Sequence, residues 1–148
     1  MKISSIFDLK KITSSIKKIL LPGDVIFLYG QIGVGKTTFV RLLINNYENE
    51  KKLKKSEVLS PTFNIVFEYE IEELTFKHFD LYRLKNSNYI KNIGLFENSE
   101  KSITLIEWPE LIKEKPQNRL DLFFEYTEDY SKRSLIIKTE GRLKIHEF

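Results

Sequence analysis

Cysteine is absent from the 148-residue chain, and methionine and tryptophan each occur once. A chain without cysteine forms no disulfide and offers no thiol nucleophile, which is compatible with a reducing compartment. No apolar run approaches the roughly 20 residues that a membrane-spanning helix requires. Residues 1–8 also lack the apolar centre of a signal peptide. We therefore expect a cytoplasmic protein with no membrane segment.

An excess of charge of one sign is missing as well, since 24 basic residues stand against 21 acidic ones and the net charge is +3. Such a balance is not by itself a signature of nucleic-acid binding. With 41% hydrophobic residues, a chain of this length has enough apolar side chains to bury one core. We expect a single domain spanning residues 1–148, and a monomer when the protein is alone.

Glycine is scarce, yet four of the six glycines lie between Gly23 and Gly35. They surround residues 30–37, GQIGVGKT, which fit the phosphate-binding pattern G-x-x-x-x-G-K-[ST]. Glycines let the backbone lie against a phosphate, and successive N–H groups then form an anion-binding nest. Lys36 supplies a charge for the β- and γ-phosphates, and the Thr37 hydroxyl can ligate Mg²⁺. The predicted binding segment comprises Gly30, Gln31, Ile32, Gly33, Val34, Gly35, Lys36 and Thr37.

The sequence on both sides of this loop supports the interpretation. Residues 25–29 are an apolar, β-branched and aromatic run that predicts a buried strand, and apolar residues within 39–44 recur at helical spacing. Strand, loop and helix follow in the order that a phosphate-binding loop requires. We therefore predict a nucleoside triphosphate site. The guanine-reading motif Asn-Lys-x-Asp is absent, so the expected nucleotide is ATP.

Apolar spacing predicts the remaining elements. A first helix is predicted between Ile6 and Leu20, with Ser4 or Ser5 as its cap. Further strands are predicted at 63–70, 75–80, 102–107, 120–126 and 134–139, with a hairpin turn at 72–73, a polar loop at 48–55 and a short helix within 81–96. Because the late strands follow one another directly, we predict an α/β fold of the P-loop NTPase-like, three-layer type with a mixed β-sheet.

A triphosphate site needs an acid on a strand beside the loop. Glu107 closes the apolar run that begins at Ile103, and Asp80 closes the run that begins at Phe76. Ligands of open α/β sheets bind at this end of the strands. Both acids are therefore candidates for catalysis, as is Lys36. Both are also candidate Mg²⁺ ligands beside Thr37, and which carboxylate contacts the metal stays open.

The histidines receive no such role. His78 alternates with apolar neighbours and is interpreted as a packed or surface residue of its strand. His146 is expected to have no function. The sequence contains no zinc-site spacing, no Ser-His-Asp arrangement and no G-x-S-x-G elbow.

Four motifs together resemble one family. The chain carries GQIGVGKTTF at 30–39, SPTF at 60–63, HFDLYRL at 78–84 and EWP at 107–109. In this order and spacing they are similar to the TsaE family, small bacterial ATPases required to make threonylcarbamoyladenosine in tRNA. Each motif alone is shared more widely than their combination.

The resemblance implies roles for particular residues. Lys36, Thr37 and Thr38 would bind phosphate and Mg²⁺, and Glu107 would be a second ligand of the metal or of its water. Ser60, Thr62 and Asp80 would form a switch-like polar cluster near the γ-phosphate. Trp108 would be the family's tryptophan beside Glu107, and Arg133 would approach the nucleotide. Gln31 departs from the family, which usually has Asp there, and adenine contacts are expected near Ser4 to Phe7.

The resemblance also implies partners. In this family the protein binds the transferase subunit TsaD with its partner TsaB, and hydrolyses ATP to reset that assembly between turnovers. Contact with tRNA would then be indirect, through the complex. We expect a Mg²⁺-dependent ATPase that is slow alone and stimulated by those subunits.

Two alternatives come from the residues themselves. A small-molecule P-loop kinase would use Asp80 as a base toward a substrate hydroxyl, but five scattered arginines give little sign of a lid. An RNA-binding module would use the lysines of residues 51–55. A solvated loop is the favoured interpretation of that run, because lysine is abundant throughout the chain.

Overall fold

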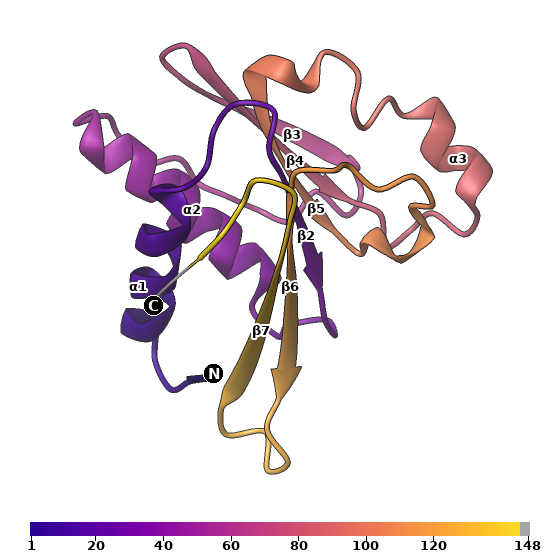
Figure 1. Ribbon diagram of the computed structural model, residues 1–148. Helices are drawn as coiled ribbons and strands as arrows, with labels where there is room; N and C mark the ends of the chain where they lie inside the picture. The colour runs from indigo at the N-terminus through magenta and orange to yellow at the C-terminus, as the bar shows by residue number, and fades with distance from the viewer. Residues whose placement is uncertain (146–148) are drawn as a thin grey trace.

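The computed structural model describes residues 1–145 (Figure 1). Its elements, in chain order, are β1 (Lys2–Ile3), α1 (Ile6–Lys17), β2 (Val25–Tyr29), α2 (Lys36–Glu50), β3 (Val66–Ile71), β4 (Leu74–Asp80), α3 (Ser87–Asn92), the 3₁₀ turn η1 (Ser99–Lys101), β5 (Ser102–Glu107), the 3₁₀ turn η2 (Pro109–Leu111), β6 (Arg119–Tyr126) and β7 (Arg133–Glu140). No helix in this part of the chain is long and apolar enough to cross a membrane.

The strands form one mixed sheet in the order β1-β7-β6-β2-β5-β4-β3. Its centre is parallel, since β2 pairs in parallel with both β5 and β6, and β4 pairs in parallel with β5. The two edges are antiparallel hairpins, β3–β4 and β6–β7. The carboxyl ends of β2, β4, β5 and β6 therefore meet at one edge, where open α/β sheets bind ligands.

Helices lie on both faces of the sheet, α1 and α2 on one and the short α3 on the other (Figure 1). Alternation along β2 divides its side chains between the two layers. Ile26 belongs to the core that contains α1 and α2, whereas Phe27 belongs to the opposite core with Leu95 and Ile112. The predicted α/β class with a mixed sheet is confirmed.

Local chemistry explains where the two main helices begin. Ser5 caps α1 by accepting the N–H of Asp8 at 3.3 Å, and the Asp8 carboxylate accepts the N–H of Ser4 at 2.8 Å. This reciprocal arrangement satisfies amide groups that a helix start leaves unpaired. At α2 the cap is Gly35, whose φ of 123° is left-handed and which has no side chain to cap the helix. The N–H groups at the start of α2 are thus left for another partner.

The structure differs from the sequence prediction at several element ends, among them the end of α1, which stops at Lys17 and not at Leu20. The strand expected from residue 63 begins at Val66, because residues 62–64 form a turn in which Ile65 donates to the Pro61 carbonyl. Helix α2 runs to Glu50, into the stretch predicted as a polar loop from residue 48, and Glu48 is buried and accepts the Ser56 amide. The short β1 was not predicted, since two residues carry no periodicity. His146 lies outside the described residues.

Candidate functional site

The glycine-rich loop between β2 and α2 packs tightly against β6. Gly30 has a φ of +145°, and a Cβ placed there would come within 2.7 Å of the Phe124 carbonyl oxygen and of a Val34 methyl. Gly33 and Gly35 also have positive φ, 79° and 123°. Only glycine adopts such angles without strain. The sequence GQIGVGK thus fixes a loop that curls back over the start of α2.

Lys36 is the first residue of α2 and is buried, with 4% of its surface exposed. Its Nζ donates to the carbonyl of Gly30 and, at 3.5 Å, to that of Gln31. The Trp108 ring covers the ammonium group, with the ring centroid 3.7 Å from Nζ. Burial lowers the pKa of Lys36, and the nearby Glu107 and Asp80 carboxylates oppose that shift. Its charge is therefore held inside the loop.

The next residue connects the loop to the neighbouring strand. The Thr37 hydroxyl donates to the Glu107 carboxylate, with its oxygen 2.9 Å from Oε2 and 3.1 Å from Oε1. Glu107 ends β5 and is 2% exposed. A hydroxyl and a carboxylate that converge in this way are oxygen ligands of the kind that Mg²⁺ prefers.

Asp80 lies directly beside Glu107, as its register partner at the end of β4. Its Oδ2 accepts the hydroxyls of Ser60 at 2.8 Å and Thr62 at 2.9 Å, and its Oδ1 accepts the N–H of Tyr82 at 2.9 Å. Three donors therefore hold a carboxylate that is only 3% exposed. The Asp80 side chain thus ties the loop that carries Ser60 and Thr62 to the end of β4.

Trp108 follows Glu107 in a left-handed conformation, with a φ of 59°. A bulky residue adopts that region only where its surroundings enforce it. Here the chain turns out of β5 into Pro109, and the indole packs against the Tyr82 ring with centroids 4.8 Å apart. The turn directs the ring over Lys36.

The β6–β7 hairpin holds the outer side of the loop. Arg133, the first residue of β7, donates through Nε to the Val34 carbonyl at 3.2 Å. Its guanidinium lies over the Tyr126 ring, 4.5 Å from the centroid, and the Tyr126 hydroxyl donates to the Ile32 carbonyl at 3.4 Å. The tyrosine contact had no signal in the sequence, because it depends on how the hairpin meets the loop.

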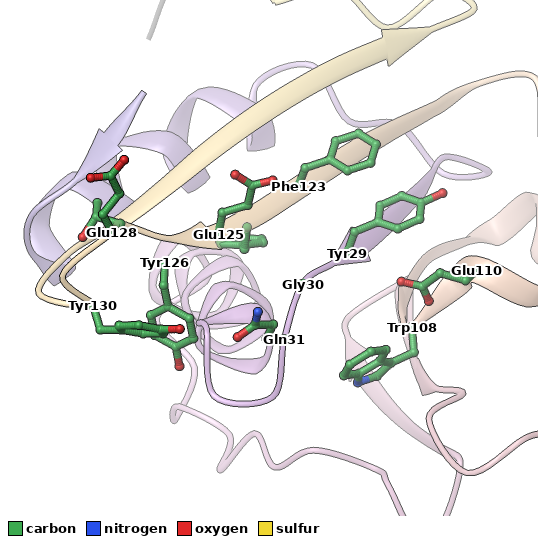
Figure 2. Close-up of a pocket in the computed structure, with 12 residues that line it drawn as sticks. Tyr29, Gly30, Gln31, Trp108, Glu110, Phe123, Glu125, Tyr126, Glu128 and Tyr130 are labelled. Carbon is green, nitrogen blue, oxygen red and sulfur yellow. The ribbon is translucent and has the colours of Figure 1, made fainter.

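Two cavities adjoin the loop. One, of about 270 Å³, is lined by the start of α1 and the start of α2 together, including Ser4, Ser5, Ile6, Thr38 and Arg133. The other, of about 600 Å³, is lined by Gly30 and Gln31 at the start of the loop. Figure 2 shows Trp108 and Glu110 on one side of this second cavity and Tyr126 and Tyr130 on the other, with Gly30 and Gln31 between them.

All of the predicted site residues gather at this edge of the sheet. The site comprises the loop and the first residues of α2, Gly30 to Thr38, together with side chains from the neighbouring strands and loops. These side chains are Ser60, Thr62, Asp80, Glu107, Trp108 and Arg133. The lysine run at 51–55 is elsewhere, and its exposed Lys51 is 3.6 Å from Glu72. That placement fits the solvated loop.

His78 is the residue that the sequence interpretation undervalued. It is completely buried on β4, and its Nε2 lies 2.6 Å from Glu107 Oε2. Alternation with apolar neighbours correctly indicated a packed strand residue. It gave no information on the register that sets this ring beside Glu107 of the next strand.

A mixed sheet with a glycine-rich loop between β2 and α2, and acids at the ends of the adjacent strands, is the architecture of the P-loop class of α/β proteins. A family model described as "Threonylcarbamoyl adenosine biosynthesis protein TsaE" matches residues 3–135. The chain belongs to the TsaE family.

Individual relatives agree with that placement. Proteins named tRNA threonylcarbamoyladenosine biosynthesis protein TsaE are 38% identical over 104 residues in Rickettsia felis, covering 70% of this chain and 58% of the relative, and 34% identical over 121 residues in Bacillus subtilis, covering 80% and 70%. The chain thus spans less than two thirds of the rickettsial protein. The crystal structure of Bacillus subtilis YdiB superposes with a TM-score of 0.70 at 27% identity, covering 95% of this chain and 84% of that one.

Proposed function

We propose that this chain is a Mg²⁺-dependent ATPase that acts in tRNA threonylcarbamoyladenosine biosynthesis. One observation carries the nucleotide part: the Thr37 hydroxyl of the glycine-rich loop lies 2.9 Å from the buried Glu107 carboxylate. A loop hydroxyl beside a strand-end carboxylate provides oxygen donors suited to a hard cation. When bound, Mg²⁺ would neutralise charge on the β- and γ-phosphates.

The chain's own residues account for the remaining steps. The loop N–H groups and the unpaired N–H groups at the start of α2 bind the phosphate oxygens. Lys36 contributes a positive charge at the β- and γ-phosphates, and attraction to these phosphates offsets the free-energy cost of burying its ammonium group. Glu107 orients the metal or its water. Asp80 holds Ser60 and Thr62 where they can respond to the γ-phosphate.

The smaller cavity is the best candidate for the adenosine. It opens beside Thr38, one residue beyond the proposed metal ligand Thr37, and its far wall is the start of α1 at Ser4 to Ile6. At about 270 Å³ its volume lies just below the roughly 300–1,000 Å³ of typical small-ligand pockets. The expected adenine contacts near Ser4 to Phe7 are retained as a proposal on this ground. Arg133 would then approach the nucleotide from the β6–β7 side.

The pathway role comes from the family and from the relatives' names, which refer to threonylcarbamoyladenosine in tRNA. Binding to TsaD and TsaB, and resetting of that assembly by hydrolysis, are part of the same proposal. One domain with a triphosphate site suits an auxiliary subunit. The expected cytoplasmic location and the monomeric state of the isolated chain stay predictions.

A complementation experiment tests the pathway role. In a bacterium depleted of its own TsaE protein, expression of this chain is expected to restore threonylcarbamoyladenosine in tRNA, measured by mass spectrometry of digested nucleosides. Lys36→Ala should not restore the modification, because the loop loses the positive charge that would bind the phosphates. Glu57→Gln, an exposed position outside the site, is the control and should restore the modification. Equal restoration by Lys36→Ala would contradict the proposal.

A further inference from the structure

The His78 imidazole is fully buried near the end of β4, and among the described residues it makes a polar contact through only one of its two nitrogens. Nε2 lies 2.6 Å from Glu107 Oε2. Nδ1 has no hydrogen-bond partner among the residues that the structure describes. An unpaired buried polar atom is costly, so the contact of Nε2 with Glu107 is the polar interaction among the described residues that offsets the burial of this ring.

The direction of this hydrogen bond follows from its acceptor. An ionised carboxylate accepts and cannot donate, so Nε2 carries the proton and donates to Glu107. The neutral ring in that tautomer leaves only a lone pair at Nδ1, which is less demanding than a buried N–H. Glu107 Oε2 thus accepts from both His78 and Thr37, and Oε1 also lies within reach of the Thr37 hydroxyl.

The strand register explains why Glu107 needs this donor. Asp80 is its direct neighbour across the β4–β5 ladder, and His78 lies two residues earlier on the same strand as Asp80. Two carboxylates on adjacent strands repel each other unless each has donors of its own. Asp80 has Ser60, Thr62 and the Tyr82 amide. Within the described residues, Glu107 has Thr37 and His78.

We infer that His78 is a positioning residue for the proposed metal site. Its Nε2–H fixes the rotation of the Glu107 carboxylate, so that both carboxylate oxygens stay within reach of the Thr37 hydroxyl. This inference rests on the proposed function, because it assigns Glu107 to the metal. Residues that orient a metal ligand in this way typically change metal affinity by about 10–100-fold when they are removed.

Four variants distinguish orientation from simple packing. His78→Gln places an amide nitrogen near the position of Nε2, whereas the shorter amide of His78→Asn reaches only the position of Nδ1. His78→Leu fills the space without a donor. Thr104→Val is the control, since Thr104 is fully buried on β5 and its hydroxyl is also unpaired among the described residues.

The measurement is Mn²⁺ binding by the ADP complex, followed by the electron paramagnetic resonance signal of free Mn²⁺. Metal-free ADP affinity is measured in parallel from Trp108 fluorescence. His78→Leu and His78→Asn should weaken Mn²⁺ binding by about 10-fold or more, with metal-free ADP affinity changed by less than about twofold. His78→Gln should recover most of the loss, and Thr104→Val should resemble the wild type.

Each other outcome overturns the inference. Unchanged Mn²⁺ affinity in His78→Leu would show that Glu107 needs no orienting donor. An equal loss of Mn²⁺ affinity in the Gln, Asn and Leu variants would assign His78 to packing alone. The same conclusion would follow if none of the three variants showed a folded baseline in thermal unfolding. A wild-type ADP complex indifferent to Mn²⁺ would refute the proposed function itself, which is a distinguishable result.

Discussion

Gly30 is the residue at which the loop and the sheet constrain each other most strongly. Replacing it with alanine adds one methyl group at a φ of +145°, 2.7 Å from the Phe124 carbonyl oxygen and 3.1 Å from the Phe124 Cβ. The carbonyl belongs to β6, which is locked to β2 by a parallel ladder. Backbone in the sheet centre cannot move aside in the way that the Val34 methyl can. We therefore predict a large loss of stability.

The magnitude follows from two separate costs. Holding a non-glycine residue in a sparsely populated backbone region costs about 1–3 kcal/mol. Forcing an extra methyl into a packed site costs about 1–3 kcal/mol more. Gly30→Ala should therefore lower the free energy of unfolding by about 2–6 kcal/mol.

Gly23→Ala is the matched control. Gly23 also has a positive φ, +97°, but its nearest neighbour would be the Glu100 carbonyl oxygen at an ordinary 3.8 Å. Gly23→Ala should lower the free energy of unfolding only by the backbone cost of about 1–3 kcal/mol. Because each kcal/mol shifts the Tm by about 2–4 °C for a domain of this size, we predict that Gly30→Ala melts about 2–12 °C below Gly23→Ala.

The assay is urea and thermal unfolding followed by circular dichroism. Equal destabilisation of the two variants would refute the reasoning, because it would mean that the start of the loop does not press on β6. Gly30→Ala should also weaken ADP binding in the folded protein, whereas Gly23→Ala should not. That second measurement separates a displaced loop from general loss of stability.

Three further predictions concern other parts of the chain. Burial, with help from Asp121 and Glu110, raises the pKa of Tyr29 to about 12. Above pH 10 the folded state therefore keeps the phenol proton that the unfolded state releases, so the free energy of unfolding should fall between about pH 10 and 12. In urea titrations, Tyr29→Phe should reduce the slope of this free energy against pH. Glu48→Ala removes the acceptor of the Ser56 amide and hydroxyl and should therefore speed tryptic cleavage at 51–55. Glu57→Ala is the control, and equal cleavage rates of the two variants would contradict this prediction. Arg133→Ala removes the donor to the loop carbonyl of Val34 and should weaken ADP binding severalfold with little change in Tm, as isothermal titration would detect.

Much of the fold could be predicted because the informative signals are local. The glycine pattern at 30–35 requires particular backbone angles, and the apolar run at 25–29 can only be buried. The acids at 80 and 107 end apolar strands, so their meeting at one edge follows once those strands are parallel neighbours. The loop and the buried strand can thus be predicted from local sequence alone, and the meeting of the two acids needs only the pairing of β4 with β5.

The parts that escaped prediction depend on contacts between distant segments. His78 reads as one apolar-flanked strand residue until the β4–β5 register sets it diagonally across from Glu107. Tyr126 holds the loop only because the β6–β7 hairpin folds toward it. The start of β3 was misplaced for a local reason, since Ile65 has a φ of 70°, which strand propensity does not foresee for a β-branched residue.

ATP hydrolysis by the purified chain, alone and with the TsaD–TsaB pair, tests the central claim most directly. We predict slow turnover alone, faster turnover with the pair, and loss of the stimulated rate in both Lys36→Ala and Glu107→Ala. The two variants remove different elements, the loop charge and the strand-end carboxylate, from one site. Equal rates with and without the pair, or full stimulation of Glu107→Ala, would contradict the assignment of this site as a partner-activated ATPase.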